Sequence, residues 1–359
     1  MDHADELVGV SEVAEERDGP GRHAGDITRP GTGPGTGYDQ GRRQTTAVDA
    51  GWSTENARGR LETADQMTDV HAGFIDDLVR RRGVVMLIGS PDTGKTTFAL
   101  RLIRAALSAG RTVAFVDGDT DQSTVGPPAC AGLAVFESPA DVEGPIEAER
   151  LHFVGAIGPE GVILQQVVAT AVLVEEARER ADLVVVDTTG TVSGVVGQTL
   201  KYHKMEVCRP DVVIGFQRGA ELEPLVGMLR RFFTADVEVA PVDPDVRPLN
   251  PEDRRTARAK SFAAAFAEPL QRWRVRNTVF APTLPAGLDV TRLEGVLVGL
   301  QDGSGHCLGL GVLEHDDGVL KVVTNRGEGM RGLWLGSLRL DLETFDVSKV
   351  RLGDVMFGV

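Results

Sequence analysis

The chain has 359 residues, enough for two domains of ordinary size, and a formal net charge of -15 at pH 7. This acidic excess argues against broad, charge-driven binding of nucleic acid and leaves only a local basic patch for such a partner. Three widely spaced cysteines without a Cys-x-x-Cys pair favour a reducing, cytoplasmic setting over a disulfide framework or a zinc site, and no apolar run is long enough to cross a membrane.

The N-terminal segment, residues 1–66, is predicted to be a disordered low-complexity tail. It is poor in large apolar side chains, and residues 29–37 are a run of Arg, Pro, Gly and Thr. Such a segment buries too little apolar surface to offset its ordering entropy. It is also acidic and polar, unlike a secretory signal. We expect the folded chain to begin near residue 67.

Residues 67–276 are predicted to form an α/β domain, because buried strands alternate with amphipathic helices. Apolar runs predict strands at 84–88, 112–116, 151–154, 183–186 and 212–216, and helices at 74–79, 97–107 and 162–180. This alternation indicates a parallel sheet with helices on both faces. Phosphate ligands of such sheets bind at the carboxyl ends of the strands.

Residues 277–359 are predicted to form a small all-β domain, barrel-like in its pattern. Short strand-like runs alternate with turns, and the Asp-Asp-Gly sequence at 316–318 is a strong hairpin signal. Residues 355–359 are expected to supply a last strand. No catalytic constellation is visible in this region.

The most informative motif is GSPDTGKT at 89–96, which fits the phosphate-binding loop G-x-x-x-x-G-K-[ST]. A predicted strand precedes it and a predicted helix follows, which is the context that the motif requires. With this motif, the predicted α/β fold class is that of a P-loop NTPase parallel sheet with helices on both faces. The predicted nucleotide-binding residues are Gly89, Ser90, Pro91, Asp92, Thr93, Gly94, Lys95, Thr96 and Thr97. The loop amides and the helix N-terminus would cradle the phosphates of a nucleoside triphosphate. Lys95 would reach the β- and γ-phosphates, and the Thr96 hydroxyl would bind Mg²⁺.

Aspartates follow two of the predicted strands. Asp187 ends the apolar run 183–186, as a Walker B residue does, and it either binds Mg²⁺ or caps the next turn. Asp117, Asp119 and Asp121 follow the strand at 112–116, which we expect beside the phosphate loop. Asp119 is the preferred general base, or it contributes to the metal site by orienting a metal-bound water. Asp117 is the alternative base or a support for the metal ligands.

In their order and spacing, these residues resemble the polynucleotide 5'-hydroxyl kinase family. The matching segments are Gly-x-x-Asp-Thr-Gly-Lys-Thr-Thr, Val-Asp-Gly-Asp-Thr-Asp-Gln, Phe-Val-Gly at 153–155, and Asp-Thr-Thr-Gly at 187–190. The family includes the kinase subunit of the eukaryotic pre-mRNA cleavage complex, the nucleolar rRNA-processing kinase and archaeal RNA/DNA kinases. The similarity extends over about residues 70–359.

The resemblance implies transfer of the ATP γ-phosphate, with Mg²⁺, to the 5'-hydroxyl of RNA or DNA, with a single-stranded end favoured. Lys95 would act on the triphosphate, and Asp119 would activate the hydroxyl. Arg254 and Arg258 would form a lid near 251–262 that neutralises charge on the transferred group. The two arginines are one helical turn apart and share a face; Arg255 is their nearest competitor. Without the resemblance, this segment reads as a solvated basic helix.

Several positions depart from the family pattern. Thr191 stands where the family usually has a Trp, so a stacking platform for a base is missing. Asp121 replaces a Gly and adds negative charge where an anionic strand is expected to approach. Ile157 and Gly158 replace a hydroxyl-bearing pair.

Two basic groups are candidate contacts for nucleic acid, with ordinary solvated helix faces as the equal alternative. The first is Arg254, Arg255, Arg258, Lys260, Arg272, Arg274 and Arg276; the second is Lys201, Lys204 and Arg209. Trp273 lies within the first group and is expected to pack at the domain junction rather than to stack on a base.

Two other functions stay open. One is a nucleotide-binding assembly or regulatory module that has lost kinase chemistry, which the Thr191 and Asp121 departures favour. The other is a small-molecule kinase or a GTPase, although no guanine-specifying N-K-x-D sequence is present. The sequence does not distinguish RNA from DNA as the acceptor.

Overall fold

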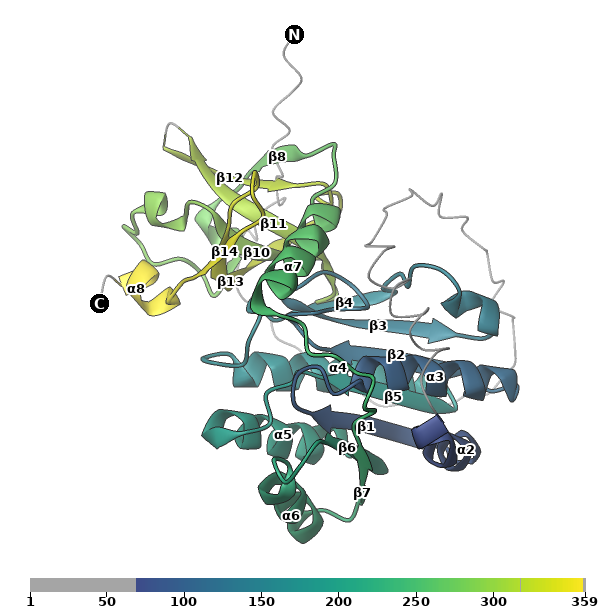
Figure 1. Ribbon diagram of the computed structural model, residues 1–359. Helices are drawn as coiled ribbons and strands as arrows, with labels where there is room; N and C mark the ends of the chain where they lie inside the picture. Colours follow the sequence, from purple (N-terminus) through teal and green to yellow (C-terminus); the bar gives the residue numbers. More distant parts are fainter. Residues whose placement is uncertain (1–68, 317, 358–359) are drawn as a thin grey trace, which may run out of the picture. The chain divides into compact units, whose positions relative to one another are not determined.

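The computed structural model describes residues 69–316 and 318–357 (Figure 1). The predicted tail, 1–66, lies outside the described residues. Two seven-stranded sheets organise the described chain. Short 3-10 helices also occur: η1 (Asp69–His71), η2 (Pro139–Val142), η3 (Asn277–Val279) and η4 (Val290–Leu293).

The first sheet has the strand order β4-β3-β2-β5-β1-β6-β7, which can be followed in Figure 1. Its strands are β1 (Gly83–Gly89), β2 (Val113–Gly118), β3 (Cys130–Phe136), β4 (Arg150–Phe153), β5 (Leu183–Thr188), β6 (Val212–Gln217) and β7 (Asp236–Pro241). Residues 84–88 of β1 are all buried. Successive side chains of a strand point to opposite faces, so a fully buried strand requires cover on both sides.

Helices supply that cover on both faces of the sheet. They are α2 (Ala72–Arg80), α3 (Lys95–Ser108), α4 (Ile163–Arg180), α5 (Gly194–Cys208) and α6 (Glu223–Phe232). Val85 and Leu87 share a core with α2 and α3. Val84 and Met86 share the opposite core with α4, α5 and α6. The predicted α/β fold class is therefore confirmed.

Three details of this sheet differ from the prediction, and the first is that the edge strand β7 was not predicted. Strand β3, which was not predicted, pairs antiparallel with β2 and with β4, so the sheet is mixed. The β2–β3 connection contains no helix, and a parallel pairing would need a longer crossover. Strand β2 also does not lie beside β1, because β5 pairs with both.

The second sheet has the order β14-β13-β10-β11-β12-β8, and β9 pairs with β13. Its strands are β8 (Gln271–Arg274), β9 (Phe280–Ala281), β10 (Val296–Gln301), β11 (Cys307–Asp316), β12 (Val319–Thr324), β13 (Gly332–Leu340) and β14 (Val347–Lys349). Strand β8 precedes the boundary expected at 277, yet it pairs with β12. Trp273 of β8 is partly buried and packs against the core of this sheet.

The chain end carries a helix where a strand was expected. Helix α8 spans Leu352–Phe357. Leu352 and Val355 lie three residues apart, and both pack against the core of the second sheet. Residues three apart share one face of a helix, so this apolar pair suits a helical turn.

Helix α7 (Pro251–Ala265) follows β7, and its C-terminal half packs against both sheets. Phe262 is fully buried in a cluster that contains Phe153 of β4 and Leu297 of β10. Beside this cluster, the backbone N–H of Ser337 donates to the carbonyl of Gly155 over 2.7 Å. One end of α7 is thereby held in a core. No helix within residues 69–316 and 318–357 has the length and apolar character needed to cross a bilayer.

Candidate active site

The phosphate loop connects β1 to α3 and has the expected glycine-dependent geometry. Gly94, the residue before α3, has a φ of 82°, in the left-handed region that glycine adopts without steric cost. A Cβ on Gly89 would lie 2.8 Å from the Phe216 carbonyl oxygen. The Thr93 hydroxyl donates to the Ser90 carbonyl over 2.9 Å and closes the loop on itself. Residues 91–94 of the loop line the pocket directly before the N-terminus of α3, and a helix N-terminus is a place where anions bind.

Lys95 is the first residue of α3, and its ammonium group lies against the loop. Its Nζ donates to the carbonyls of Gly89 and Ser90 over 3.0 and 2.9 Å. Burial lowers the pKa of Lys95, and the nearby carboxylates of Asp187, Asp119 and Asp92 oppose that shift. The cation is therefore held at the loop among carboxylates rather than exposed to solvent.

Thr96 and Asp187 meet at the end of β5. The Thr96 hydroxyl donates to Asp187 Oδ2 over 2.5 Å, and the backbone N–H of Thr188 donates to Oδ1 over 2.8 Å. Burial raises the pKa of Asp187, while Lys95 and the Thr96 hydroxyl oppose this. Asp187 is not a turn cap that faces away from the loop, since its carboxylate is directed at the start of α3.

Asp117, the alternative base, is buried and already saturated with hydrogen bonds. It accepts from the backbone N–H groups of Asp119, Thr124 and Val125, with the last two on one oxygen. Burial raises its pKa to about 7, with the charges of Asp187 and Asp119 adding to the shift. These bonds shape the loop after β2, so Asp117 organises that loop and does not line the pocket.

Asp119 lines the pocket from the same loop. Its Oδ1 accepts from the backbone N–H groups of Asp121 and Gln122 over 3.0 and 3.2 Å. These two bonds orient the carboxylate at the carboxyl end of β2. Among the two carboxylates considered as a base, Asp119 is therefore the one placed to meet a ligand.

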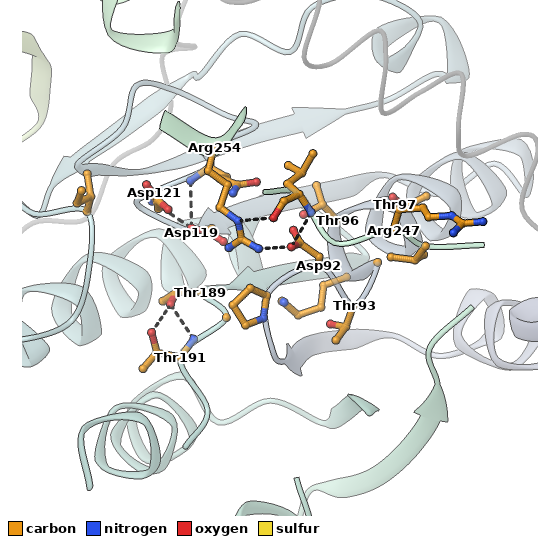
Figure 2. Close-up of a pocket in the computed structure, with 18 of the residues that line it drawn as sticks. Asp92, Thr93, Thr96, Thr97, Asp119, Asp121, Thr189, Thr191, Arg247 and Arg254 are labelled. Carbon is orange, nitrogen blue, oxygen red and sulfur yellow. Dashed lines mark hydrogen bonds and ion pairs between the residues drawn. The ribbon is translucent and has the colours of Figure 1, made fainter. Parts of the chain in front are cut away.

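A pocket of about 730 Å³ is lined by residues 91–97 and by Asp119 (Figure 2), whereas Asp117, Asp187 and Arg258 are not among its lining residues. Its lining residues come from the phosphate loop and the start of α3, from the segments after β2, β4 and β5, from the connection between β7 and α7, and from α7 itself. They include Asp119, Asp121, Gln122, Ile157, Thr189, Gly190, Thr191, Asp245, Val246, Arg247, Leu249 and Arg254. Two neighbouring anionic groups of a ligand could thus meet the loop amides and Arg254 at once.

The N-terminal half of α7 supplies the two predicted lid arginines. Asn250 caps the helix by accepting from the N–H of Asp253 over 2.8 Å. Arg254 pairs with the carboxylate of Asp92 in the phosphate loop (Figure 2), and Arg258 pairs with Asp121 over 2.5 Å.

Arg255, the competing lid candidate, faces away from the pocket. Its guanidinium pairs with Asp346 over 2.5 Å, and it is 64 % exposed, against 26 % for Arg254. Arg272 of the first basic group likewise pairs with Glu314. These pairs are ordinary surface ion pairs, as the alternative interpretation of that basic group expected.

The second basic group does not form a surface funnel. Lys201 and Lys204 on α5 are both fully buried. Lys201 donates to the Thr188 hydroxyl over 2.8 Å and to the Thr189 carbonyl over 2.7 Å, which ties the pocket segment after β5 to α5. Thr189 in turn accepts from the backbone of Thr191 over 3.1 Å (Figure 2). The sequence pattern did not reveal this role, because lysines are usually exposed.

Sequence reasoning also missed residues that lie near the phosphate loop. Arg218, after β6, donates to the Asp92 carbonyl. Asp245, Arg247 and Leu249 line the pocket from the connection before α7. That connection is rich in proline and has no apolar periodicity, so only its position after a strand end hinted at a site.

The donor groups suit Mg²⁺, although no cluster of three His, Cys, Asp or Glu side chains occurs within the part of the chain that the structure describes. Mg²⁺ usually takes one or two protein oxygens and completes its shell with water and substrate phosphates. The adjacent oxygens of Thr96 and Asp187 meet that requirement beside the phosphate loop.

The chain is similar to known proteins along most of its folded length. A protein-family model described as mRNA cleavage and polyadenylation factor CLP1 P-loop matches residues 89–268. A polyribonucleotide 5'-hydroxyl-kinase of Methanocaldococcus jannaschii is 27% identical over 320 residues, covering 72% of this chain and 87% of that protein. Its counterpart in Thermococcus kodakarensis is 29% identical over 322 residues, covering 74% and 91%.

A solved structure shares the fold. A chain in the structure of the wild-type Clp1p–Pcf11p complex aligns with a TM-score of 0.56 at 12% identity, over 80% of each chain. This likeness concerns the fold, while the family model and the two relatives confirm the resemblance to a P-loop kinase family that the motifs indicated.

Proposed function

We propose that this chain, which belongs to the CLP1 P-loop family, is an ATP-dependent polynucleotide 5'-hydroxyl kinase. The observation that carries the proposal is one pocket lined by the phosphate loop, by Asp119 and by Arg254. A triphosphate site, a carboxylate for an acceptor hydroxyl and a cation for the transferred group are what phosphoryl transfer requires. The relatives named as polyribonucleotide 5'-hydroxyl-kinases support the same reaction.

In this proposal, the loop amides and Lys95 hold the β- and γ-phosphates of ATP. Lys95 would release its bonds to the loop carbonyls when phosphate oxygens replace them. Thr96 and Asp187 would hold Mg²⁺, which neutralises charge on the phosphates. These residues bind and orient the donor without taking part in bond making.

Asp119 would accept the proton of the acceptor 5'-hydroxyl. The freed oxygen attacks the γ-phosphorus, the bond from that phosphorus to the bridging oxygen breaks, and ADP leaves. Arg254 would neutralise charge on the transferred group, with Asp92 as the partner that it exchanges for phosphate. The products are ADP and a 5'-phosphorylated strand.

The test is transfer of label from γ-labelled ATP to RNA and DNA oligonucleotides with a 5'-hydroxyl, with free nucleosides as competing acceptors. The wild-type chain is expected to label an oligonucleotide. Lys95→Ala and Asp119→Ala are expected to lower the rate about 100-fold or more. Asp182→Asn, which alters a surface ion pair with Arg82 at the opposite end of β5, serves as the control.

Two results would contradict the proposal. Tight ATP binding without any transfer, unchanged by Asp119→Asn, would indicate a binding module. Labelling of nucleosides but never of an oligonucleotide would indicate a small-molecule kinase.

A further inference from the structure

The ion pair between Asp121 and Arg258 joins the loop after β2 to the lid helix α7. The two side chains meet over 2.5 Å, although 137 residues separate them. Asp121 is 30% exposed and Arg258 is 17% exposed, so the pair is largely withdrawn from solvent. A guanidinium–carboxylate contact in such a setting is stronger than one on the open surface.

Asp121 also touches the acceptor side of the pocket. It lines the pocket, and its backbone N–H donates to Asp119 Oδ1 over 3.0 Å. Asp121 therefore lies two residues along the loop from Asp119, the group to which we assign proton abstraction. An acceptor strand whose 5'-hydroxyl reaches Asp119 must bring its first backbone phosphates near this carboxylate.

The two lid arginines have different partners, and the difference separates their roles. Arg254 pairs with Asp92, which belongs to the nucleotide-binding loop. Arg258 pairs with Asp121, which belongs to the loop that carries Asp119. A carboxylate and a phosphate offer the guanidinium fork similar pairs of oxygens, so either one can occupy Arg258.

We propose that the Asp121 carboxylate weakens binding of the acceptor strand, because it competes with a backbone phosphate of the strand for the Arg258 guanidinium. This inference rests on the proposed kinase function. Binding of a strand then exchanges one ion pair of Arg258 for another. Arg258 therefore contributes little to the binding free energy of the strand. An acceptor must instead gain its affinity from contacts that Asp121 does not oppose.

The test measures binding directly, so that it does not depend on catalysis. A single-stranded RNA with a 5'-hydroxyl and a 3'-fluorophore is titrated with the full chain, Mg²⁺ and a non-hydrolysable ATP analogue, and anisotropy is followed at several salt concentrations. The variants are Asp121→Asn, which removes the charge and keeps the shape of the side chain, and Asp121→Gly, which removes both. The matched control is Asp346→Asn, which removes the carboxylate partner of Arg255 on the same helix.

Both Asp121 variants are expected to bind the strand about 3- to 10-fold more tightly at low salt. The slope of log affinity against log salt should steepen by about 0.7, the value for one additional phosphate contact on a single strand. Adding Arg258→Ala to Asp121→Asn should remove both changes, and Asp346→Asn should cause neither. Affinity for the ATP analogue should stay unchanged, which also verifies folding.

Equal or weaker strand binding by both Asp121 variants, with an unchanged salt slope, would overturn the inference. If wild-type chain still binds and labels the strand in that case, the kinase proposal stands and only the role of Asp121 fails. If wild-type chain neither binds nor labels any strand, both proposals fail.

Discussion

The Thr96 hydroxyl donates to Asp187 Oδ2 over 2.5 Å and so joins the first turn of α3 to the end of β5. This contact places the two proposed magnesium ligands together before any ion binds. Asp187→Asn should keep the fold, since an amide has the same shape, but it removes the anionic ligand. We expect the Mg²⁺ concentration for half-maximal transfer to rise about 10- to 100-fold. Initial rates across a magnesium titration measure this.

A Thr96→Val variant provides a comparison for Asp187→Asn in the Mg²⁺ titration. Thr96→Val removes a neutral ligand and should raise the half-maximal Mg²⁺ concentration less than Asp187→Asn does. An Asp187→Asn enzyme with the wild-type magnesium curve would show that Asp187 supports the loop and does not bind the metal.

The two neighbouring arginines of α7 offer a matched pair of variants. Arg254 faces Asp92 in the phosphate loop, whereas Arg255 pairs with Asp346 away from the pocket. Arg254→Ala is expected to lower kcat about 100-fold, because the transferred group loses a cation. Arg255→Ala should stay within about twofold of the wild type. Steady-state rates at saturating ATP and oligonucleotide decide between these residues, and equal losses would refute the assignment.

Four of the five strands that the sequence predicted are buried on both faces, and β4, whose residues alternate between partly buried and buried, is the exception. Residues 84–88 and 183–186 are continuous apolar runs, because helices cover each side of β1 and β5. Strand β3 was missed, because Cys130–Phe136 is rich in small residues and follows an irregular loop. The direction of β3 depends on the length of that loop, which periodicity does not report.

The site was predictable where it follows a local motif and not where it depends on long-range pairing. Lys95 and Thr96 occupy fixed places in the phosphate-loop pattern. The partner of Arg258 lies 137 residues away, so no local pattern indicates Asp121. Lys201 and Lys204 are charged residues on a helix, and only the tertiary structure shows that both are buried.

Gly190 is predicted to be required for close packing against the phosphate loop. A Cβ at this position would lie 2.6 Å from the Pro91 backbone nitrogen. A backbone atom cannot move aside unless the whole phosphate loop shifts. Gly190→Ala should therefore raise the ATP Kd about 10-fold or more, since displaced loop amides meet the phosphates poorly. Gly73→Ala on α2 is the control, because its Cβ would meet no atom within 4 Å. Isothermal titration with an ATP analogue measures both, and an unchanged Kd for Gly190→Ala would contradict the packing argument.

Lys204 is predicted to make the free energy of unfolding change with pH. Its side chain is fully buried, and within the described part of the chain its Nζ has no hydrogen-bond partner. Burial lowers its pKa below the ordinary value of 10.5, while Cys208 and nearby aspartates oppose the shift. The unfolded chain then binds more protons than the folded chain between the lowered pKa and 10.5. The free energy of unfolding must therefore rise with pH in that window, by at most about 1.4 kcal/mol per pH unit.

Lys204→Met removes the titratable group, so that this position no longer binds a proton in either the folded or the unfolded chain. The variant should be more stable than the wild type at pH values below the window, where the buried ammonium destabilises the fold, and the difference should shrink as pH rises through the window. Urea denaturation at a series of pH values measures both curves. Lys349→Met, at a residue that is 74% exposed, provides the comparison and should leave the pH dependence unchanged. Parallel curves for Lys204→Met and the wild type would mean that Lys204 keeps its ordinary pKa in the folded chain.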